Sequence, residues 1–142
     1  MIQRSISEAL AGKTVTRLTP EMSVRDACHM LELQNAGAAV VVQDGRLVGI
    51  FSERDVIRKC VCMARRTDDT TVSEIMTPDP VCIALTGTMA DALRIMLDGG
   101  FRHLPVLNDS HVVGLLSMRD IPTENRLLVE RFREYTQEPI VA

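Results

Sequence analysis

Apolar residues in this chain occur first at helical spacing and then in short continuous runs. Across residues 24–31 they recur every three or four positions, which predicts an amphipathic helix. Two apolar runs follow at 38–42 and 47–51, and the Asp44-Gly45 pair between them favours a tight β-hairpin. A second helix is expected to begin at Ser52, where the hairpin ends.

The same succession of elements returns further along the chain. Residues 89–96 repeat the helical spacing, and apolar runs at 104–107 and 112–116 repeat the hairpin. A short strand is expected ahead of each copy, at 14–18 and at 81–85. The pattern therefore predicts two copies of one strand–helix–hairpin–helix unit.

Residue identities support the duplication. Overlaying residues 23–57 on 88–122 without gaps gives nine identities, whereas chance would give roughly two at average composition. The identical pairs are Asp26/Asp91, Ala27/Ala92, Val41/Val106, Asp44/Asp109, Val48/Val113, Gly49/Gly114, Ser52/Ser117, Arg54/Arg119 and Asp55/Asp120. A site built by one copy is therefore expected to have a counterpart in the other.

The fold class follows from the elements of each copy. A hairpin between helices, with a leading strand, places the chain in the α/β class. One copy of about 50 residues is too small to bury its apolar face alone, so the two copies must pack together. We expect a first repeat with its N-terminal segment at 1–62, a linker at 63–80, a second repeat at 81–123 and a C-terminal helical tail at 124–142. Within the linker, residues 72–78 predict a single helical turn that a proline stops.

Composition narrows the functional classes. The chain has 142 residues, of which 46% are hydrophobic and 3% aromatic, so an aliphatic core is expected. The net charge of -3 and the scarcity of aromatic side chains argue against a nucleic-acid-binding protein. No apolar stretch approaches the roughly 18–20 residues of a membrane span, and the N-terminus lacks the apolar core of a signal peptide. We therefore expect a cytoplasmic protein with neither a nucleic-acid nor a membrane partner.

The cysteines show no CxxC spacing; they are Cys28, Cys60, Cys62 and Cys82. Their places in apolar segments favour small buried side chains. Cys60-x-Cys62 offers an alternative as a redox or metal-binding pair, although a single intervening residue is a weak signal. With only three histidines in the whole chain, no metal site is expected.

Each copy carries a Ser-x-x-Asp motif where a strand runs into a helix, with Ser52 and Asp55 in the first and Ser117 and Asp120 in the second. Such a motif can be a capping box that only satisfies backbone N–H groups. A helix N-terminus also presents free N–H groups to a ligand. A carboxylate accepts two hydrogen bonds, so both aspartates suit the paired hydroxyls of a ribose, with the serine hydroxyls beside them. The sequence leaves both interpretations open.

Phosphate groups would need separate cations, because a carboxylate repels them. The candidates are Arg54, Arg119, Arg102, His103, Arg58 and Lys59. Each could equally be a solvated surface charge. Arg102 and His103 enter an apolar strand in which Pro105 removes a backbone donor, so His103 could simply be an edge residue of that strand. Because the matching segment Gly37-Ala38 is uncharged, the two clefts are expected to differ in anion affinity.

Three segments together resemble a known family. They are Gly49-Ile50-Phe51-Ser52-Glu53-Arg54-Asp55, Val72-Ser73-Glu74-Ile75-Met76-Thr77-Pro78 and Phe101-Arg102-His103-Leu104-Pro105-Val106. From about residue 13 to 122 the chain resembles tandem cystathionine-β-synthase-type (CBS) domain pairs, and more closely those that stand alone. The resemblance implies two β-α-β-β-α repeats packed about a pseudo-twofold axis, with their sheets face to face. Pro122 departs from the family pattern, so the last helix is expected to be displaced.

The resemblance also implies a ligand. Clefts between the repeats of such pairs often hold AMP, ATP, NAD or S-adenosylmethionine, and the motif aspartate, here Asp55 and Asp120, holds the ribose. Segments that line the adenine correspond to Thr16, Ala38, Ala39, Val81 and Leu104. With Arg102 and His103 beside its phosphates, one site is expected to be tighter than the other, and His103 is expected to stay protonated to higher pH than a free imidazole.

The favoured interpretation is a non-catalytic regulatory module for an adenine nucleotide, acting on a target that lies on another chain. Nothing resembles an activated nucleophile, and His103 with Asp120 is the only acid–base pairing to consider. The alternatives are a redox or metal sensor using Cys60 and Cys62, and an interaction scaffold with vestigial clefts. A homodimer is expected, because two helix faces carry more apolar surface than one small domain needs. These faces comprise Val56, Ile57 and Cys60, and Met89, Leu93 and Met96.

Overall fold

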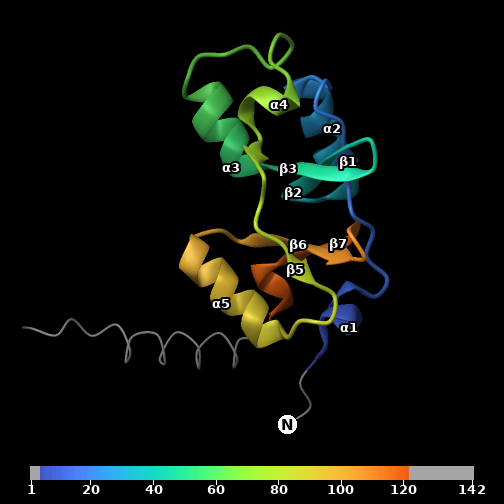
Figure 1. Ribbon diagram of the computed structural model, residues 1–142. Helices are drawn as coiled ribbons and strands as arrows, with labels where there is room; N and C mark the ends of the chain where they lie inside the picture. Colours follow the sequence, from blue (N-terminus) through green and yellow to red (C-terminus); the bar gives the residue numbers. More distant parts are fainter. Residues whose placement is uncertain (1–3, 122–142) are drawn as a thin grey trace, which may run out of the picture.

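The computed structural model describes residues 4–121, which form two similar halves stacked on one another (Figure 1). The first half contains β1 (Arg17–Leu18), α2 (Val24–Gln34), β2 (Ala38–Gln43), β3 (Arg46–Ser52), α3 (Glu53–Val56) and the π-helical turn η1 (Ile57–Val61). The second contains β5 (Ile83–Ala84), α5 (Met89–Gly99), β6 (His103–Asn108), β7 (His111–Ser117) and the 3₁₀ turn η2 (Met118–Asp120). Helix α1 (Ile6–Leu10) precedes the first half, and α4 (Val72–Ile75) and β4 (Thr77–Pro78) lie between the halves. The predicted α/β class with two repeated units is confirmed.

The two hairpins have the same register. Strand β2 pairs antiparallel with β3 from Ala38↔Ser52, and β6 pairs with β7 from His103↔Ser117, so each pairing recurs 65 residues later. Both hairpins carry a register shift at the corresponding position. The leading strands β1 and β5 add in parallel to β2 and β6. The sequence repeat is therefore also a repeat of backbone hydrogen bonding.

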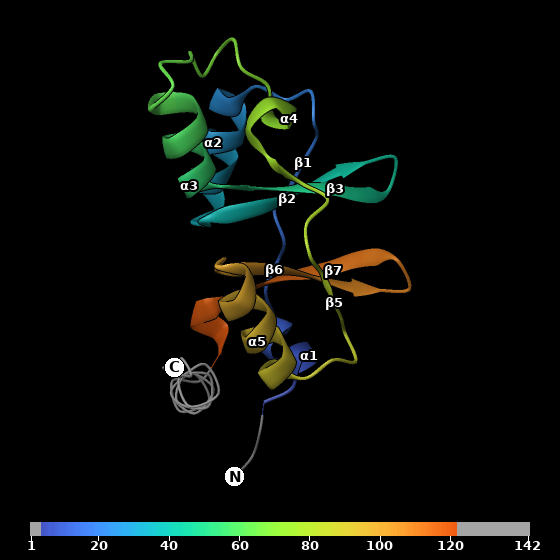
Figure 2. The ribbon, with the colours of Figure 1, turned by 60° about the vertical axis from the view of Figure 1, so that its left-hand side comes forward.

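The two sheets face each other, and the helices cover their outer faces. Figure 2 shows α2 and α3 outside the first sheet, and α1 and α5 outside the second. One bond between the halves runs from the Arg17 guanidinium to the Val112 carbonyl oxygen at 2.8 Å. Residues of both repeats therefore border the space between the sheets.

The ends of the long helices follow from local sequence. The side chains of Ser23 and Thr88 each accept a backbone N–H bond of 3.0 Å at the start of α2 and α5. Asn35 and Gly100, with φ of 50° and 71°, terminate these helices in the left-handed region. Both helices therefore begin and end where the sequence predicted.

Helices α1 and α4 cross between the repeats. Ile6 and Ala9 of α1 are buried in the core of the second half, whereas Val72 and Ile75 of α4 are buried in the core of the first. Strand β4 then completes the first sheet by pairing with β3. The hydrophobic pattern gave no prediction of α1, and part of the segment expected in the first repeat packs with the second. This exchange ties the two halves together.

The expected surplus of apolar helix surface is wrong for most of the residues that suggested it. Cys60, Met89, Leu93 and Met96 are at most 4% exposed and fill the cores of their own halves. Only Ile57 of that set is strongly exposed, at 57%. The exposed large apolar side chains of the first half are Leu33, Ile57, Val61 and Met63.

The described part of the chain ends just after the second repeat motif. Turn η2 stops at Asp120, and Ile121 is extended (φ -89°, ψ 127°), as residues before proline usually are. Pro122 and the predicted tail at 124–142 lie outside the described residues. Within residues 4–121, no helix combines the length and the apolar character that crossing a membrane requires.

Candidate functional site

Both Ser-x-x-Asp motifs are capping boxes. Asp55 Oδ2 accepts the backbone N–H of Ser52 at 3.2 Å, and Ser52 Oγ accepts the backbone N–H of Asp55 at 3.2 Å. In the second repeat, Asp120 Oδ2 accepts the backbone N–H of Ser117 at 2.7 Å. The capping role that the sequence suggested is therefore real in both halves.

Capping uses only one oxygen of each carboxylate. Asp55 Oδ1 lies 3.1 Å from Lys59 Nζ and accepts a weak bond of 3.5 Å from the Thr77 hydroxyl. Asp120 Oδ1 forms an ion pair with Lys13. Each aspartate thus keeps a second oxygen whose partner is a lysine. The two lysines come from unrelated places in the repeat, because Lys59 follows the motif and Lys13 precedes β1.

The larger cavity, here the Asp55 cleft, has a volume of about 600 Å³. Its walls come from both repeats: residues within 52–59, at and after the end of β3, line it together with residues 99–103, which lead into β6. The lining residues are Gly37, Ile50, Ser52, Glu53, Arg54, Asp55, Arg58, Lys59, Thr77, Asp79, Pro80, Val81, Gly99, Gly100, Phe101, Arg102 and His103. Small-molecule sites typically measure roughly 300–1,000 Å³, so the volume suits a nucleotide-sized ligand.

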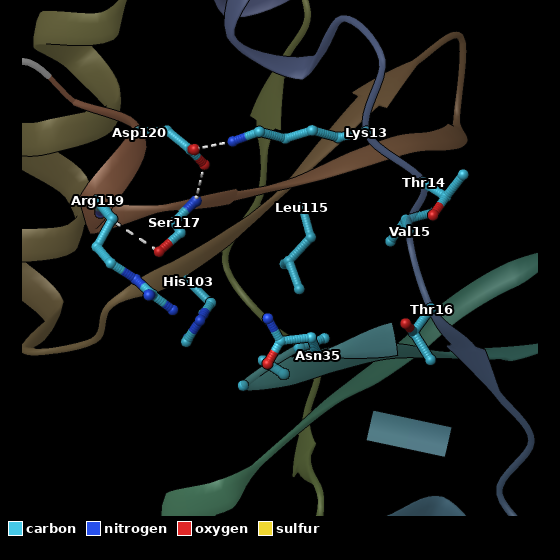
Figure 3. A pocket seen from close by; sticks show the side chains of 13 residues that line it. Lys13, Thr14, Val15, Thr16, Asn35, His103, Leu115, Ser117, Arg119 and Asp120 are labelled. Carbon is cyan, nitrogen blue, oxygen red and sulfur yellow. Dashed lines mark hydrogen bonds and ion pairs between the residues drawn. The ribbon is translucent and has the colours of Figure 1, made fainter. Parts of the chain in front are cut away.

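The smaller cavity, here the Asp120 cleft, has a volume of about 330 Å³. Figure 3 shows Asp120, Ser117, Arg119 and His103 on one side and Thr14, Val15 and Thr16 on the other, with Lys13 reaching across to Asp120. Asn35, Ala36, Gly37, Ala38 and Leu115 complete the wall.

The repeats exchange walls between the two clefts. Asp55 of the first repeat faces Arg102 and His103 of the second, whereas Asp120 of the second faces Gly37 and Ala38 of the first. The cationic segment that the sequence singled out therefore serves the Asp55 cleft. His103 and Gly37 line both cavities, and His103 is the one of the two that contributes a side chain.

His103 lies in an electrostatic environment that disfavours its charged form. Burial lowers the pKa of His103 from the ordinary value of 6.5, and the guanidinium groups of Arg119 and Arg102 lower it further. The carboxylates of Glu53 and Asp120 raise it, without outweighing the other effects. The sequence predicted a raised pKa for His103 when phosphate is bound beside it. Without a ligand, the pKa of His103 is lowered instead.

Among the described residues, Arg54, Arg102 and Arg119 are cations without a carboxylate partner. Within residues 4–121 none of them forms an ion pair, and Arg54 and Arg102 are exposed at the rim of the Asp55 cleft. The Arg119 guanidinium extends toward the His103 ring in the Asp120 cleft (Figure 3). These three groups are placed where an anionic ligand would find unshared donors.

The structure places most of the predicted site residues on cavity walls. Ser52, Arg54, Asp55, Val81, Arg102 and His103 line the Asp55 cleft, and Thr16, Ala38, Ser117, Arg119 and Asp120 line the other. Ala39 and Leu104 are fully buried instead, in the cores of their own halves. Successive strand residues point to opposite faces, so Ala38 and His103 face the clefts while their neighbours face the helices. Pro105 is buried, and it lines neither of these two cavities.

Three further cleft residues, Lys13, Glu53 and Thr77, are not predicted by the repeat motif. Lys13 corresponds to Pro78 at the repeat offset and Glu53 to Met118, so comparison of the two copies gives no signal for either. Thr77 lies in the linker segment whose sequence predicts only a helical turn, yet β4 brings it against Asp55. Lys13 and Thr77 lie in segments that precede the strand–helix–hairpin units, and Glu53 has no counterpart in the second copy, so a search for a motif shared by the two copies finds none of them.

The cysteine pair does not form a shared site. Cys60 is fully buried, and its thiol lies 3.4 Å from the Arg65 carbonyl oxygen, whereas Cys62 is exposed. Across residues 4–121, no group of three or more His, Cys, Asp or Glu side chains is arranged to hold a metal ion. The redox or metal alternative therefore has no geometric support in the described residues.

Known proteins share this arrangement. The family model of the CBS domain matches residues 6–61 and again residues 72–122. The CBS domain-containing protein CBSX3 of Arabidopsis thaliana, described as mitochondrial, is 34% identical over 128 residues, which are 84% of this chain and 62% of that protein. The chain thus spans less than two thirds of that relative's length.

Solved structures agree with the sequence comparison. The crystal structure of the CBS domain protein NE2398 has a TM-score of 0.78 and 37% identity, covering 84% of this chain and 95% of that one. The CBS domain protein PAE2072 of Pyrobaculum aerophilum, solved in complex with AMP, has a TM-score of 0.77 and 27% identity, covering 93% and 99% of the two chains. With two family matches placed on the two structural repeats, this chain belongs to the CBS domain family and consists of a tandem pair of CBS domains.

Proposed function

We propose that this protein is a non-catalytic regulatory module that binds adenosine-containing ligands in its two clefts. The observation that carries the proposal is the position of Asp55 and Asp120. Each is fixed by a capping box at a strand–helix junction and keeps one carboxylate oxygen beside a cavity lined by cations. The AMP complex of the Pyrobaculum aerophilum relative supports an adenine nucleotide as the ligand class.

Asp55 and Asp120 suit the ribose. A carboxylate held by backbone N–H groups is already oriented, so accepting hydroxyl bonds requires little further ordering. The cost is that Lys59 or Lys13 must share or release its partner oxygen. Both ammonium groups then lie next to the ligand, where a phosphate would be a replacement partner.

The clefts differ in their capacity for phosphate. Arg54, Arg58 and Arg102 line the larger cavity, whereas Arg119 is the one guanidinium on the wall of the smaller cavity. Glu53 and Asp79 offset part of this positive charge, so the difference rests on room and on the number of bidentate donors. We propose that the Asp55 cleft prefers ligands with several phosphates and that the Asp120 cleft prefers a monophosphate.

A catalytic role has no support from the site. His103 and Asp120 line one cleft, but Asp120 is occupied by Ser117 and Lys13 rather than by the imidazole. We propose that the module acts through a separate target protein.

A reducing compartment such as the cytosol is consistent with four free cysteines. Cell fractionation with detection of the tagged protein tests the compartment.

Titration of nucleotide-stripped protein tests the proposal. Calorimetry with AMP, ATP, NAD and S-adenosylmethionine should show binding of at least one ligand at micromolar concentrations. The 2′,3′-dideoxy analogue of that ligand should bind about tenfold more weakly, because it lacks the hydroxyls assigned to the aspartates. In a protein carrying Asp55→Asn and Asp120→Asn together, this difference should shrink. Absence of binding by all four ligands at millimolar concentration would refute the proposal.

A further inference from the structure

The two clefts share one side chain. His103, the first residue of β6, lines the Asp55 cleft and the Asp120 cleft at once. A β-carbon placed on Gly37, which also lines both clefts, would lie 3.9 Å from His103 Nε2 and 3.7 Å from Glu53 Oε2. The imidazole therefore stands at the meeting point of the two cavities, beside Gly37, which has no side chain.

Charged groups reach this imidazole from three elements. Arg102 precedes it on its own segment, Arg119 and Asp120 face it from η2, and Glu53 faces it from α3. Lys13 lies on the wall of the Asp120 cleft but is engaged with Asp120. An anion in either cleft would add negative charge to this set, so both ligands act on the same ring.

We propose that His103 couples the two clefts, so that an anionic ligand in one weakens binding of an anionic ligand in the other, and that acidification relieves this antagonism. The proposal rests on the proposed function, because it requires that both clefts bind nucleotides. Two phosphate groups near one imidazole repel each other. A neutral imidazole has a single N–H donor for two acceptors, whereas an imidazolium has two donors and a positive charge.

The direction of the pH effect follows from the surroundings. In the unliganded protein the pKa of His103 is lowered, so the ring is neutral at neutral pH. The first bound phosphate raises that pKa, and the second raises it again, because each stabilises the imidazolium. Proton uptake therefore accompanies double occupancy, and lowering the pH must favour the doubly bound state.

Two single-cleft variants make the coupling measurable. Asp55→Asn weakens the Asp55 cleft and Asp120→Asn weakens the Asp120 cleft, and each leaves the affinity of the other cleft to be measured alone. In wild type at pH 8, the second AMP should bind at least about fivefold more weakly than these isolated affinities require, which is the lower end of usual coupling between sites. Adenosine, which has no phosphate, should fill the two clefts independently. Melting curves check that both variants are folded.

Acidification needs its own control, because the phosphate group also gains a proton near pH 6. At pH 5.5 the affinities of the two clefts in wild type should be within about twofold of independent binding. In His103→Gln, which cannot gain a charge, the antagonism should decrease clearly less between pH 8 and pH 5.5. His29→Gln, an exposed histidine on α2, should behave as wild type. A second measurement needs no cleft variants. The pKa of His103, obtained by NMR from the pH dependence of its ring signals, should be higher with AMP than without it.

The outcomes separate the two proposals. If AMP fills both clefts but with independent affinities at both pH values, or if adenosine shows the same antagonism, the coupling is refuted while the binding function stands. If His103→Gln loses the antagonism with pH as strongly as wild type, the phosphate and not the imidazole is responsible, and the coupling through His103 is again refuted. If neither cleft binds adenosine or AMP, the proposed function itself fails.

Discussion

Lys13 and Asp120 form an ion pair across the smaller cleft, although 107 residues separate them in the chain. Lys13 belongs to the segment between α1 and β1, and α1 is anchored in the core of the second half. The crossing of α1 is therefore what delivers a cation to the cleft of the second repeat. A ligand that uses Asp120 must compete with this ammonium group or recruit it.

Lys13→Met should change the ligand preference of the Asp120 cleft. Measured in an Asp55→Asn background, AMP should bind about fivefold more weakly, because a partly exposed cation contributes up to ~1 kcal/mol. Adenosine should bind equally well or better, because its competitor for Asp120 is gone. Calorimetry with both ligands gives the ratio. An unchanged AMP-to-adenosine ratio would mean that Lys13 serves only as the partner of Asp120.

Asp120→Ala should weaken adenosine ligands in the smaller cleft by on the order of 1.5–3 kcal/mol, through loss of a charged hydrogen-bond pair. It should also lower the melting temperature, because the 2.7 Å bond to the Ser117 backbone N–H disappears. Asp91→Ala is the matched control, since Asp91 occupies the same capping position on α5 and lines neither of the two clefts. It should lower stability without affecting affinity. Equal affinity in wild type and Asp120→Ala would leave capping as the whole role of this aspartate.

The free energy of unfolding should fall as the pH drops below about 6.5, partly because of His103. Its pKa is lowered in the folded protein, so the unfolded chain binds the proton first and acid favours unfolding. The loss begins near the ordinary value of 6.5 and is complete below the folded pKa. Urea denaturation at pH 5 and pH 7.5 should show a smaller difference for His103→Gln than for wild type. His29→Gln, the control, should show the same difference between the two pH values as wild type. The same result for His103→Gln would contradict a contribution from the His103 ring.

Much of the fold could be predicted because the determining signals are local. The helix caps at Ser23 and Thr88 and the hairpin turn at Asp44-Gly45 are short patterns whose physics does not depend on distant residues. The paired hairpins follow from a repeat that is visible in the sequence. Asp55 and Asp120 were found for the same reason, since each lies at a capping position.

The remaining features depend on contacts between distant segments. The α1 crossing, and with it the Lys13–Asp120 pair, requires knowing which core receives Ile6. The shared position of His103 requires knowing that the repeats exchange walls. The apolar helix residues such as Leu93 were misjudged because periodicity shows that a face is buried, but not whether its own half or a second chain covers it.

The second hairpin turn should be less stable than the first. Asp109 and Ser110 have φ of 48° and 69°, in the left-handed region that costs most residues roughly 1 kcal/mol relative to glycine. The equivalent of Ser110 in the first hairpin is Gly45, at φ 77°. Ser110→Gly should therefore raise the free energy of unfolding by up to about 1 kcal/mol, and Gly45→Ser should lower it by a similar amount. Chemical denaturation of both variants measures these changes in the free energy of unfolding. Two changes of the same sign would contradict the prediction.

The exposed apolar side chains of the first half offer a candidate contact for a homodimer. Leu33, Ile57, Val61 and Met63 are between 57% and 82% exposed and all belong to the first half or its adjoining loop. We propose that a second copy covers them, since large apolar side chains exposed on one half of a small protein are candidates for burial against a partner. Ile57→Glu should convert the dimer to a monomer in light scattering at micromolar concentration, because it places a charge in that contact. Val113→Glu, at a 41% exposed position on β7 of the other half, is the control and should leave the dimer intact. A wild-type protein that is already monomeric, or a dimer that survives Ile57→Glu, would rule out this face as the contact.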